Sequence, residues 1–198
     1  MDSASGMDLY WQLARLRRWT FVALLLSGLP LSSVSRAASV TPISRECEIK
    51  AAFIYNFTKF VEWPVGGLAD HRAPFVIGVL GDSGCDAALE RLASDHQING
   101  HPIEVHKVAS AQEVRSVQIL YVSRTQEQQF AALASAITVA PVLTVGESAT
   151  FVSAGGMVNF VQQDNKLRFE INVHSATQAG LRVSAQVLKL ATSVRESS

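Results

Sequence analysis

The sequence is poor in cysteine and has no excess of charge of either sign. Its 198 residues include two cysteines, and 17 basic residues balance 17 acidic ones. Proteins that bind nucleic acid usually carry a clear basic excess, so no nucleic-acid partner is expected. Hydrophobic residues make up 48% of the chain, and its length suits a single domain that buries its own core.

The chain also lacks a hydrophobic run long enough for a membrane span. The apolar run over residues 19–31 has 13 residues, against roughly 20 for a transmembrane helix. It follows a short basic cluster made up of Arg15, Arg17 and Arg18. Small residues come next, and Ser35 and Ala37 fit the small-x-small cleavage rule. We therefore predict a secretory signal peptide over residues 1–37. A transmembrane anchor and a start at Met7 remain alternatives.

Cleavage after Ala37 leaves 13 basic and 15 acidic residues, which is again close to neutral. Residues 38–45 then form a predicted flexible N-terminal segment, and residues 46–195 a single domain. Because a cleaved secretory signal implies export, we expect the mature chain outside the cytoplasm.

Both cysteines, Cys47 and Cys85, lie after the predicted cleavage site. In an oxidising compartment such a pair can close a disulfide, which here would link the start of the first helix to the end of the first strand. Two free buried thiols are the alternative. The sequence contains no C-x-x-C spacing, so it shows neither a redox motif nor a zinc knuckle.

Strands and helices alternate along the rest of the chain. Apolar residues at three- and four-residue steps predict a helix over 46–63, and a continuous apolar run predicts a strand buried on both faces at 75–80. Further strands are expected at 103–108, 117–122 and 142–145, and helices at 83–95, 125–134, 148–155, 175–179 and 185–191. The segments 157–162 and 167–173 flank Asp164-Asn165 and predict a hairpin. The fold class is therefore α/β: a mainly parallel sheet flanked by helices on both faces, with a late antiparallel hairpin.

Three interpretations fit the turn after the first buried strand, which reads Gly81-Asp82-Ser83-Gly84. Ser83 and Asp86 have the spacing of a capping box, which makes the turn structural. Backbone N–H groups in a glycine-bearing turn before a helix also bind anions, so the loop is a candidate site of a small-molecule binding module. The same residues resemble the nucleophile segment of trypsin-like proteases. Those enzymes are all-β, and no accompanying histidine signature is present here.

Neither metal nor catalytic chemistry has a clear signature. The five-residue spacing of His96, His101 and His106 suggests a metal site. However, an odd spacing along a strand sends side chains to opposite faces, so solvated surface histidines are expected. The acidic residues show no spacing that requires acid–base chemistry, and no nucleophile has a visible base. We therefore predict a non-enzymatic protein without a cofactor or a metal site.

Two polar residues stand out against the predicted elements. Asn56 lies within the apolar stripe of the first helix, and a buried amide must be hydrogen-bonded, so we expect it to fasten the helix to a neighbouring loop. On the strand from residue 167, Arg168 shares one face with Glu170 and Asn172. Its guanidinium is available to a carboxylate of this chain or of a partner.

Six blocks of sequence share one order and cover nearly all of the mature chain: 48–64, 77–82, 155–161, 167–172, 179–184 and 188–191. The first reads EIKAAFIYNFTKFVEWP and the third GGMVNFV. In this order the blocks resemble the YfiR family of periplasmic proteins. The positions that match the family's polar and aromatic motifs are Lys50, Asn56, Lys59, Trp63, Asn159, Arg168 and Asn172.

The resemblance implies a periplasmic α/β domain with a regulatory role. The namesake of the family binds the periplasmic sensor part of a membrane-anchored diguanylate cyclase and holds it inactive, which limits cyclic-di-GMP and biofilm formation. The implied partner of this chain is therefore the periplasmic domain of such a cyclase, while a homodimer stays open. The namesake has more cysteines, so at most one bridge, between Cys47 and Cys85, can form here.

Overall fold

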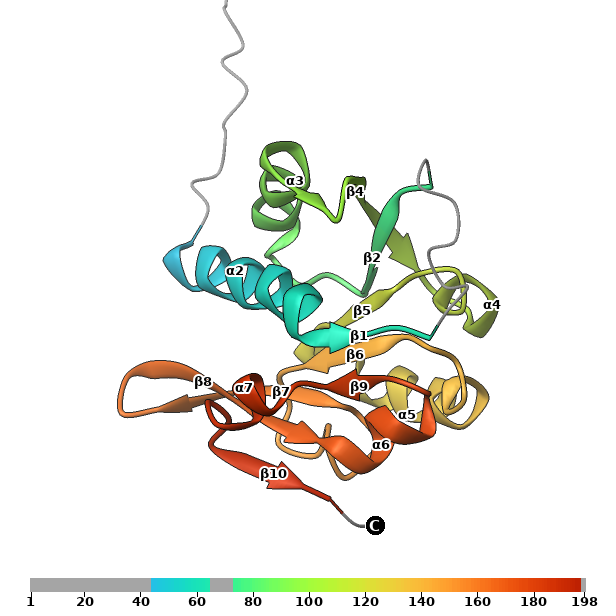
Figure 1. The fold of residues 1–198 in the computed structure, drawn as a ribbon, viewed down its shortest axis with the longest axis vertical. Helices are drawn as coiled ribbons and strands as arrows, with labels where there is room; N and C mark the ends of the chain where they lie inside the picture. The colour runs from blue at the N-terminus through green and yellow to red at the C-terminus, as the bar shows by residue number, and fades with distance from the viewer. Residues whose placement is uncertain (1–43, 65–72, 197–198) are drawn as a thin grey trace, which may run out of the picture. The chain divides into compact units, whose positions relative to one another are not determined.

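The computed structural model describes residues 44–64 and 73–196, which fold as one α/β unit (Figure 1). The predicted signal peptide over residues 1–37 and most of the segment 38–45 lie outside the described residues. Among the described residues, no helix combines the length and apolar character that a bilayer crossing needs. The fold class predicted from the sequence is confirmed.

Within the described residues, eight strands form one mixed sheet in the order β10-β8-β7-β6-β5-β2-β4-β3. Their bounds are β2 (Phe75–Leu80), β3 (Gln97–Ile98), β4 (His101–Val108), β5 (Ile119–Val122), β6 (Leu143–Gly146), β7 (Val158–Gln163), β8 (Lys166–Asn172) and β10 (Ser193–Arg195). Pairing is parallel from β4 through β2, β5 and β6 to β7, and again between β10 and β8. The predicted hairpin is β7–β8, which pairs antiparallel.

Helices cover both faces of the sheet, as predicted. One face carries α2 (Arg45–Phe60), α3 (Asp86–Asp95), α6 (Val173–Gln178) and α7 (Ala185–Leu188), and the other carries α4 (Ala111–Val114) and α5 (Glu127–Ile137), which follows η1 (Arg124–Gln126). All six residues of β2 are buried. Phe75, Ile77 and Val79 face the core under α2, and Val76 and Leu80 face the core under α5. This alternation explains why the strand is apolar at nearly every position.

The first helix ends earlier than the sequence predicts. α2 begins after Ser44, whose side chain accepts a hydrogen bond from the Cys47 N–H, and it ends at Phe60. Val61 is already extended and starts β1 (Val61–Glu62), which pairs with β9 (Arg182–Val183). The prediction of a helix to residue 63 is wrong, because pairing with a distant strand overrides the helical periodicity at these positions.

The helix start predicted at Ser83 is also wrong. α3 begins at Asp86, and its cap residue, Cys85, makes no side-chain cap hydrogen bond. Ser83 Oγ instead accepts a hydrogen bond from the Cys85 N–H at 3.1 Å, and Asp82 Oδ1 accepts one from the Gly84 N–H at 3.2 Å. Two local side-chain turns of this kind move the cap two residues along the chain, from the predicted Ser83 to Cys85.

The helix predicted over 148–155 is replaced by a series of turns. Phe151 is buried and packs against Phe130, with ring centroids 4.5 Å apart. Its ring lies over Gly146 and Gly156, where a Cβ atom would collide with it. Gly155 has a φ of 94°, which only glycine adopts readily. The anchored ring and this left-handed residue keep the segment against the sheet in place of a helix.

Local turn chemistry explains the hairpin. Asp164 and Asn165 have φ values of 50° and 56°. A two-residue hairpin turn with both residues left-handed matches the twist of the strands, and Asp and Asn tolerate this conformation better than most residues. The sequence prediction of a tight turn at these two residues agrees with the pairing of β7 and β8.

The predicted disulfide is present. Cys47 on α2 is bonded to Cys85 directly before α3, with a Cα–Cα distance of 5.0 Å and 38 residues of separation. The bond fastens the start of α2 to the turn that follows β2, and the alternative of two free thiols is rejected.

Candidate functional site

A buried charge cluster lies between α2 and the carboxyl end of β6. Lys50 occupies the inner face of α2 and is only 6% exposed. Its Nζ atom lies 2.7 Å from Glu46 Oε1, one helical turn earlier, and 2.6 Å from Glu147 Oε2, directly after β6. A buried ammonium is tolerated only when it is paired and hydrogen-bonded, and these two carboxylates meet that need.

Tyr121 completes the Lys50 cluster, which we define as Glu46, Lys50, Tyr121 and Glu147. The Tyr121 hydroxyl donates to Glu147 Oε1 at 3.0 Å. Burial of the ammonium lowers the pKa of Lys50, but the hydrogen bonds and charges of Glu147 and Glu46 outweigh burial and raise it overall. Burial, followed by the charge and hydrogen bond of Glu147, raises the pKa of the Tyr121 phenol. At neutral pH the cluster therefore holds a charged lysine and a neutral tyrosine.

Beside this cluster lies a hollow of about 460 Å³, which we call the β6 hollow. It opens between the start of α5, the turn after β6 and the strand β7. The side chains and backbone that line it come from Arg124, Glu127, Glu147, Ser148, Ala149, Asn159, Phe160, Val161 and Gln162. Open α/β sheets bind ligands beyond the carboxyl ends of their parallel strands, which is where the β6 hollow lies.

A second hollow, of about 570 Å³, lies at the carboxyl end of β2 and includes Gly81 and Asp82 of the candidate anion loop. The Lys107 ammonium lies 2.7 Å from Asp86 Oδ1 and donates to Gly81 O at 2.9 Å. The Gly84 N–H already bonds the Asp82 carboxylate. An anion would have to displace that carboxylate and share a lysine that is already paired, so anion binding by Gly81, Asp82, Ser83 and Gly84 stays a prediction.

The motif positions of the first helix separate in space. Lys50 is buried in the Lys50 cluster, whereas Asn56 and Lys59 are exposed. The expectation that Asn56 fastens the helix to a loop is wrong, because its Oδ1 accepts a hydrogen bond from Lys59 Nζ, 3.4 Å away on the same helix. Trp63 is half-buried and its ring packs edge-on against Phe75, with centroids 5.5 Å apart.

The motif positions of the hairpin also differ from one another in burial and in contacts. Asn172 is buried, and its Oδ1 accepts a hydrogen bond from the Ser175 N–H, so it caps α6. Arg168 is exposed on β8, on the face of the sheet opposite Phe169 and hence opposite α2. Asn159 is buried on β7 and lines the β6 hollow. Of the predicted positions, the structure thus brings only Lys50 and Asn159 to the neighbourhood of Glu147.

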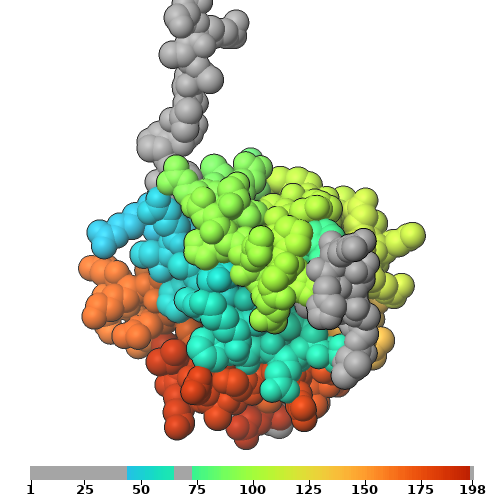
Figure 2. Space-filling view, turned by 45° about the horizontal axis from the view of Figure 1, so that its top comes forward, coloured from blue at the N-terminus to red at the C-terminus, as the bar shows by residue number. Residues whose placement is uncertain are grey.

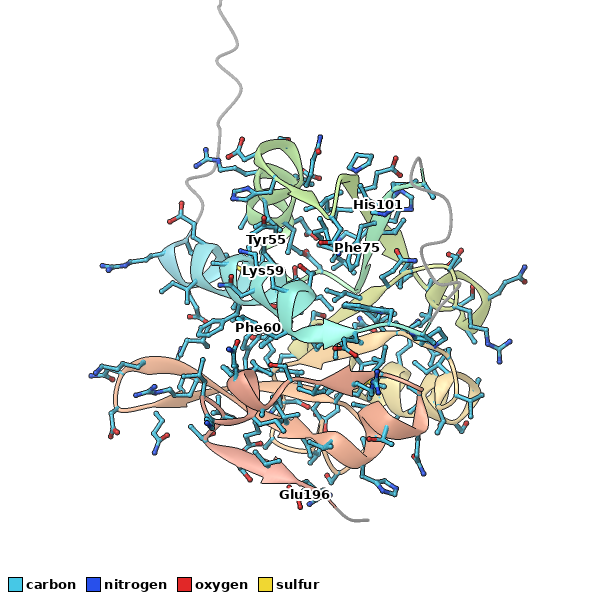
Figure 3. All side chains as sticks on the ribbon, in the orientation of Figure 1. Tyr55, Lys59, Phe60, Phe75, His101 and Glu196 are labelled. Atoms are coloured by element: carbon cyan, nitrogen blue, oxygen red, sulfur yellow. A yellow bond between two sulfur atoms is a disulfide. The ribbon has the colours of Figure 1, made fainter. Side chains whose placement is uncertain are left out.

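The histidines serve separate local contacts. His106 is exposed, with Nε2 2.8 Å from Glu104 Oε2, and the exposed His96 packs on Tyr55 with ring centroids 4.7 Å apart. The expectation of a solvated surface is wrong for His101, which is 4% exposed and has Nδ1 2.8 Å from Ala73 O (Figure 3). No group of three or more potential metal ligands occurs in the part of the chain that the structure describes.

Sequence reasoning missed Tyr121, Glu147 and Ser148. One signal for Glu147 was available, because it is the first charged residue after a buried parallel strand, where α/β proteins place functional side chains. The four-residue spacing of Glu46 and Lys50 was a second signal for an ion pair. Tyr121 had no signal, because it reads as one more apolar residue of a buried strand.

Comparison with known proteins gives a family and a fold. A family model described as YfiR/HmsC-like matches residues 47–192. No curated protein matches the chain.

Two solved structures share the fold at low identity. A conserved domain protein from Vibrio cholerae O1 biovar El Tor has a TM-score of 0.50 and 16% identity, over 75% of this chain and 60% of that one. An ABC domain from Streptococcus pneumonia, solved in complex with L-Trp, has a TM-score of 0.50 and 17% identity, with the same coverage of 75% and 60%. The chain therefore spans less than two thirds of either protein, and the likeness concerns the fold alone.

Proposed function

The chain belongs to the YfiR/HmsC-like family, and from this membership we propose that it binds the periplasmic sensor domain of an inner-membrane diguanylate cyclase and represses it. Proteins of this family are periplasmic regulators of diguanylate cyclases and not enzymes. Repression by this chain would limit cyclic-di-GMP and biofilm formation. The observation that carries the proposal is the extent of the match, which spans nearly all of the described domain.

The exposed face of α2 is the surface that we assign to the partner. Ile49, Ala52, Asn56 and Lys59 recur at three- and four-residue steps and are all exposed. Ile49 is one of the few large apolar side chains left accessible, at 39% exposed. Figure 2 shows α2, in blue to cyan, at the surface between the green segment that includes α3 and the orange to red C-terminal elements. Exposed apolar area flanked by polar groups is typical of a surface that binds another protein.

Lys59 adds a charge to this surface. Its ammonium lies 4.3 Å from the centre of the Tyr55 ring and 3.4 Å from Asn56 Oδ1. Tyr55 and Lys59 lie side by side on α2 (Figure 3). These contacts hold the side chain along the helix. Within residues 44–64 and 73–196 Lys59 forms no ion pair. A partner carboxylate facing α2 therefore completes its charge pairing, which favours specificity and fast association.

Crosslinking in the periplasm tests this proposal. A photo-reactive residue in place of Ala52 faces solvent and leaves the core intact, and crosslinked membrane proteins are identified by mass spectrometry. We expect enrichment of a diguanylate cyclase that has a periplasmic domain. Deletion of the gene should then raise cellular cyclic-di-GMP. If no cyclase is captured and the deletion leaves cyclic-di-GMP unchanged, the proposal fails.

Two charge reversals of equal size locate the surface. Lys59→Glu alters the proposed face of α2, and Arg168→Glu alters an exposed residue on the opposite face of the sheet. Both variants should fold normally, since both side chains are exposed. Lys59→Glu should lose crosslinking and fail to restore low cyclic-di-GMP in the deletion strain, whereas Arg168→Glu should retain both. The reverse result would move the partner to the hairpin.

A further inference from the structure

We propose that the β6 hollow binds a small uncharged molecule with adjacent hydroxyl groups, of the size of a monosaccharide, which Asn159 and Ser148 hold by hydrogen bonds. The site is separate from the α2 surface that we assign to the protein partner. It does not depend on the identity of that partner.

The position and size of the hollow suit a small ligand. The turn after β6 contributes Glu147 and Ser148, β7 contributes Asn159 and Gln162, and the segment that leads into α5 contributes Arg124. Three separate elements therefore surround one space at the carboxyl end of a parallel strand. A volume of about 460 Å³ falls within the usual range of small-molecule sites.

Two polar atoms point to an occupant. Asn159 is 2% exposed and Ser148 is 7% exposed, and both line the hollow. Asn159 Oδ1 and Ser148 Oγ have no hydrogen-bond partner anywhere in the described part of the chain. Burial of an amide or hydroxyl without a partner costs about 1–3 kcal/mol. Folding alone gains nothing from two such groups, and a ligand that bonds both would remove this cost.

Asn172 provides an internal comparison. It lies on the neighbouring strand β8 and is also buried, at 4% exposed. Its amide is used within the fold, because Oδ1 accepts from the Ser175 N–H at 3.0 Å and Nδ2 donates to Val152 O at 3.4 Å. The domain can thus satisfy a buried asparagine at this depth, and Asn159 is the exception.

The charges around the hollow favour a neutral ligand. Glu147 already engages Lys50 through one carboxylate oxygen and Tyr121 through the other. Arg124 is exposed and Glu127 is half-buried, so these two charges of the lining stay in contact with water, whereas the buried Asn159 and Ser148 carry no charge. A charged ligand held by Asn159 and Ser148 would lose its hydration against two uncharged groups, and the buried carboxylate beside them, Glu147, is already paired.

Hydroxyl groups match the free atoms. A hydroxyl donates to Asn159 Oδ1 and can accept from Ser148 Oγ–H at the same time, whereas an ammonium donates only.

Nuclear magnetic resonance on the purified full-length mature protein tests the assignment. The probes are D-glucose, D-xylose and N-acetyl-D-glucosamine at millimolar concentration, with ethanolamine and glycolate as charged probes of small size. We expect saturable shifts of the Asn159 side-chain amide with at least one sugar and none with the charged molecules. If no sugar shifts this amide, or if a charged probe does so equally, the proposal is overturned.

A pair of substitutions separates binding from folding. Asn159→Leu removes the unpartnered Oδ1 atom at similar volume, so it should leave the unfolding free energy unchanged or increase it while weakening sugar binding about tenfold or more. Asn172→Leu removes a satisfied amide and should destabilise the domain. Ser148→Ala should weaken binding with little effect on folding, and it decides the question if Asn159→Leu does not fold. Unchanged sugar binding in a folded Asn159→Leu or Ser148→Ala protein would refute the site.

Discussion

The Lys50 ammonium lies 2.6 Å from the Glu147 carboxylate, although 97 residues separate the two along the chain. Lys50 stands on α2 and Glu147 stands at the carboxyl end of β6, so the pair fastens the first helix to the middle of the sheet. Their side chains are only 7% and 10% exposed. A buried pair of this kind fixes the helix position more through the cost of breaking it than through its own net energy.

Removal of one partner of this pair should be costly. Lys50→Met leaves the Glu147 carboxylate buried without its counter-charge, and we expect a loss of about 3 kcal/mol in the free energy of unfolding. Urea denaturation followed by circular dichroism measures this free energy of unfolding. The matched control is Arg182→Met, which breaks the exposed pair between Arg182 and Glu62 at 3.1 Å and should cost less than about 1 kcal/mol. Equal losses in the two variants would show that Lys50 is not held by its charge.

The Lys50 cluster also predicts alkaline instability. The raised pKa of Lys50 gives stability that is present below its ordinary value of 10.5 and is lost as pH rises through the folded pKa. The raised pKa of Tyr121 acts in the same direction, because above its ordinary value of 10.0 the unfolded chain ionises first. Both groups therefore destabilise the protein only above about pH 10.

Tyr121→Phe separates the tyrosine contribution. At neutral pH the variant lacks the hydrogen bond to Glu147 and should be less stable by about 1 kcal/mol. Because it has no phenol to ionise, its stability should fall less steeply above pH 10, and the difference from the parent protein should shrink or reverse. Urea denaturation at neutral pH and at alkaline pH gives both values. A constant difference across this range would contradict the assigned pKa shift.

Gly156 should be intolerant of even a methyl group. A Cβ atom at Gly156 would collide with the Phe151 ring, which is 1% exposed and belongs to the core under α5. Gly156→Ala must displace this ring, and we expect a loss of about 1–3 kcal/mol in thermal denaturation. The neighbouring Gly155 has open space around its Cα and a φ of 94°. Gly155→Asn should therefore cost less, since Asn tolerates a left-handed backbone.

The sequence allowed the layout of the fold to be predicted where one local pattern decided the structure. The apolar run of β2 reflects burial on both faces, and Asp164-Asn165 encodes the hairpin turn by its backbone preference. The predictions failed where tertiary contacts override local pattern. Val61 leaves the helical pattern because β9 pairs with it, and the turns around Phe151 depend on the two glycines that accommodate its ring.

The candidate site was less accessible to prediction for the same reason. Lys50 and Asn159 carried a signal through the family motif, but the motif does not say that the Lys50 ammonium is paired and that Asn159 Oδ1 has no hydrogen-bond partner. Glu147 and Tyr121 meet Lys50 only after the strands β5 and β6 have paired and α2 has packed on them. Apart from the four-residue step between Glu46 and Lys50, the members of this cluster share no spacing in the sequence, so Tyr121 and Glu147 look like ordinary core and strand-end residues.

The disulfide should contribute strongly to stability. The bond between Cys47 and Cys85 closes a loop across 38 residues, for which the chain-entropy model gives about 4 kcal/mol. Urea denaturation with and without reductant measures the difference. The double variant Cys47→Ser with Cys85→Ser should match the reduced protein and should not respond to reductant. Reaction of the native, non-reduced protein with a thiol reagent would show that the bond is absent. If reductant leaves the free energy of unfolding unchanged, the loop is already ordered without the bond.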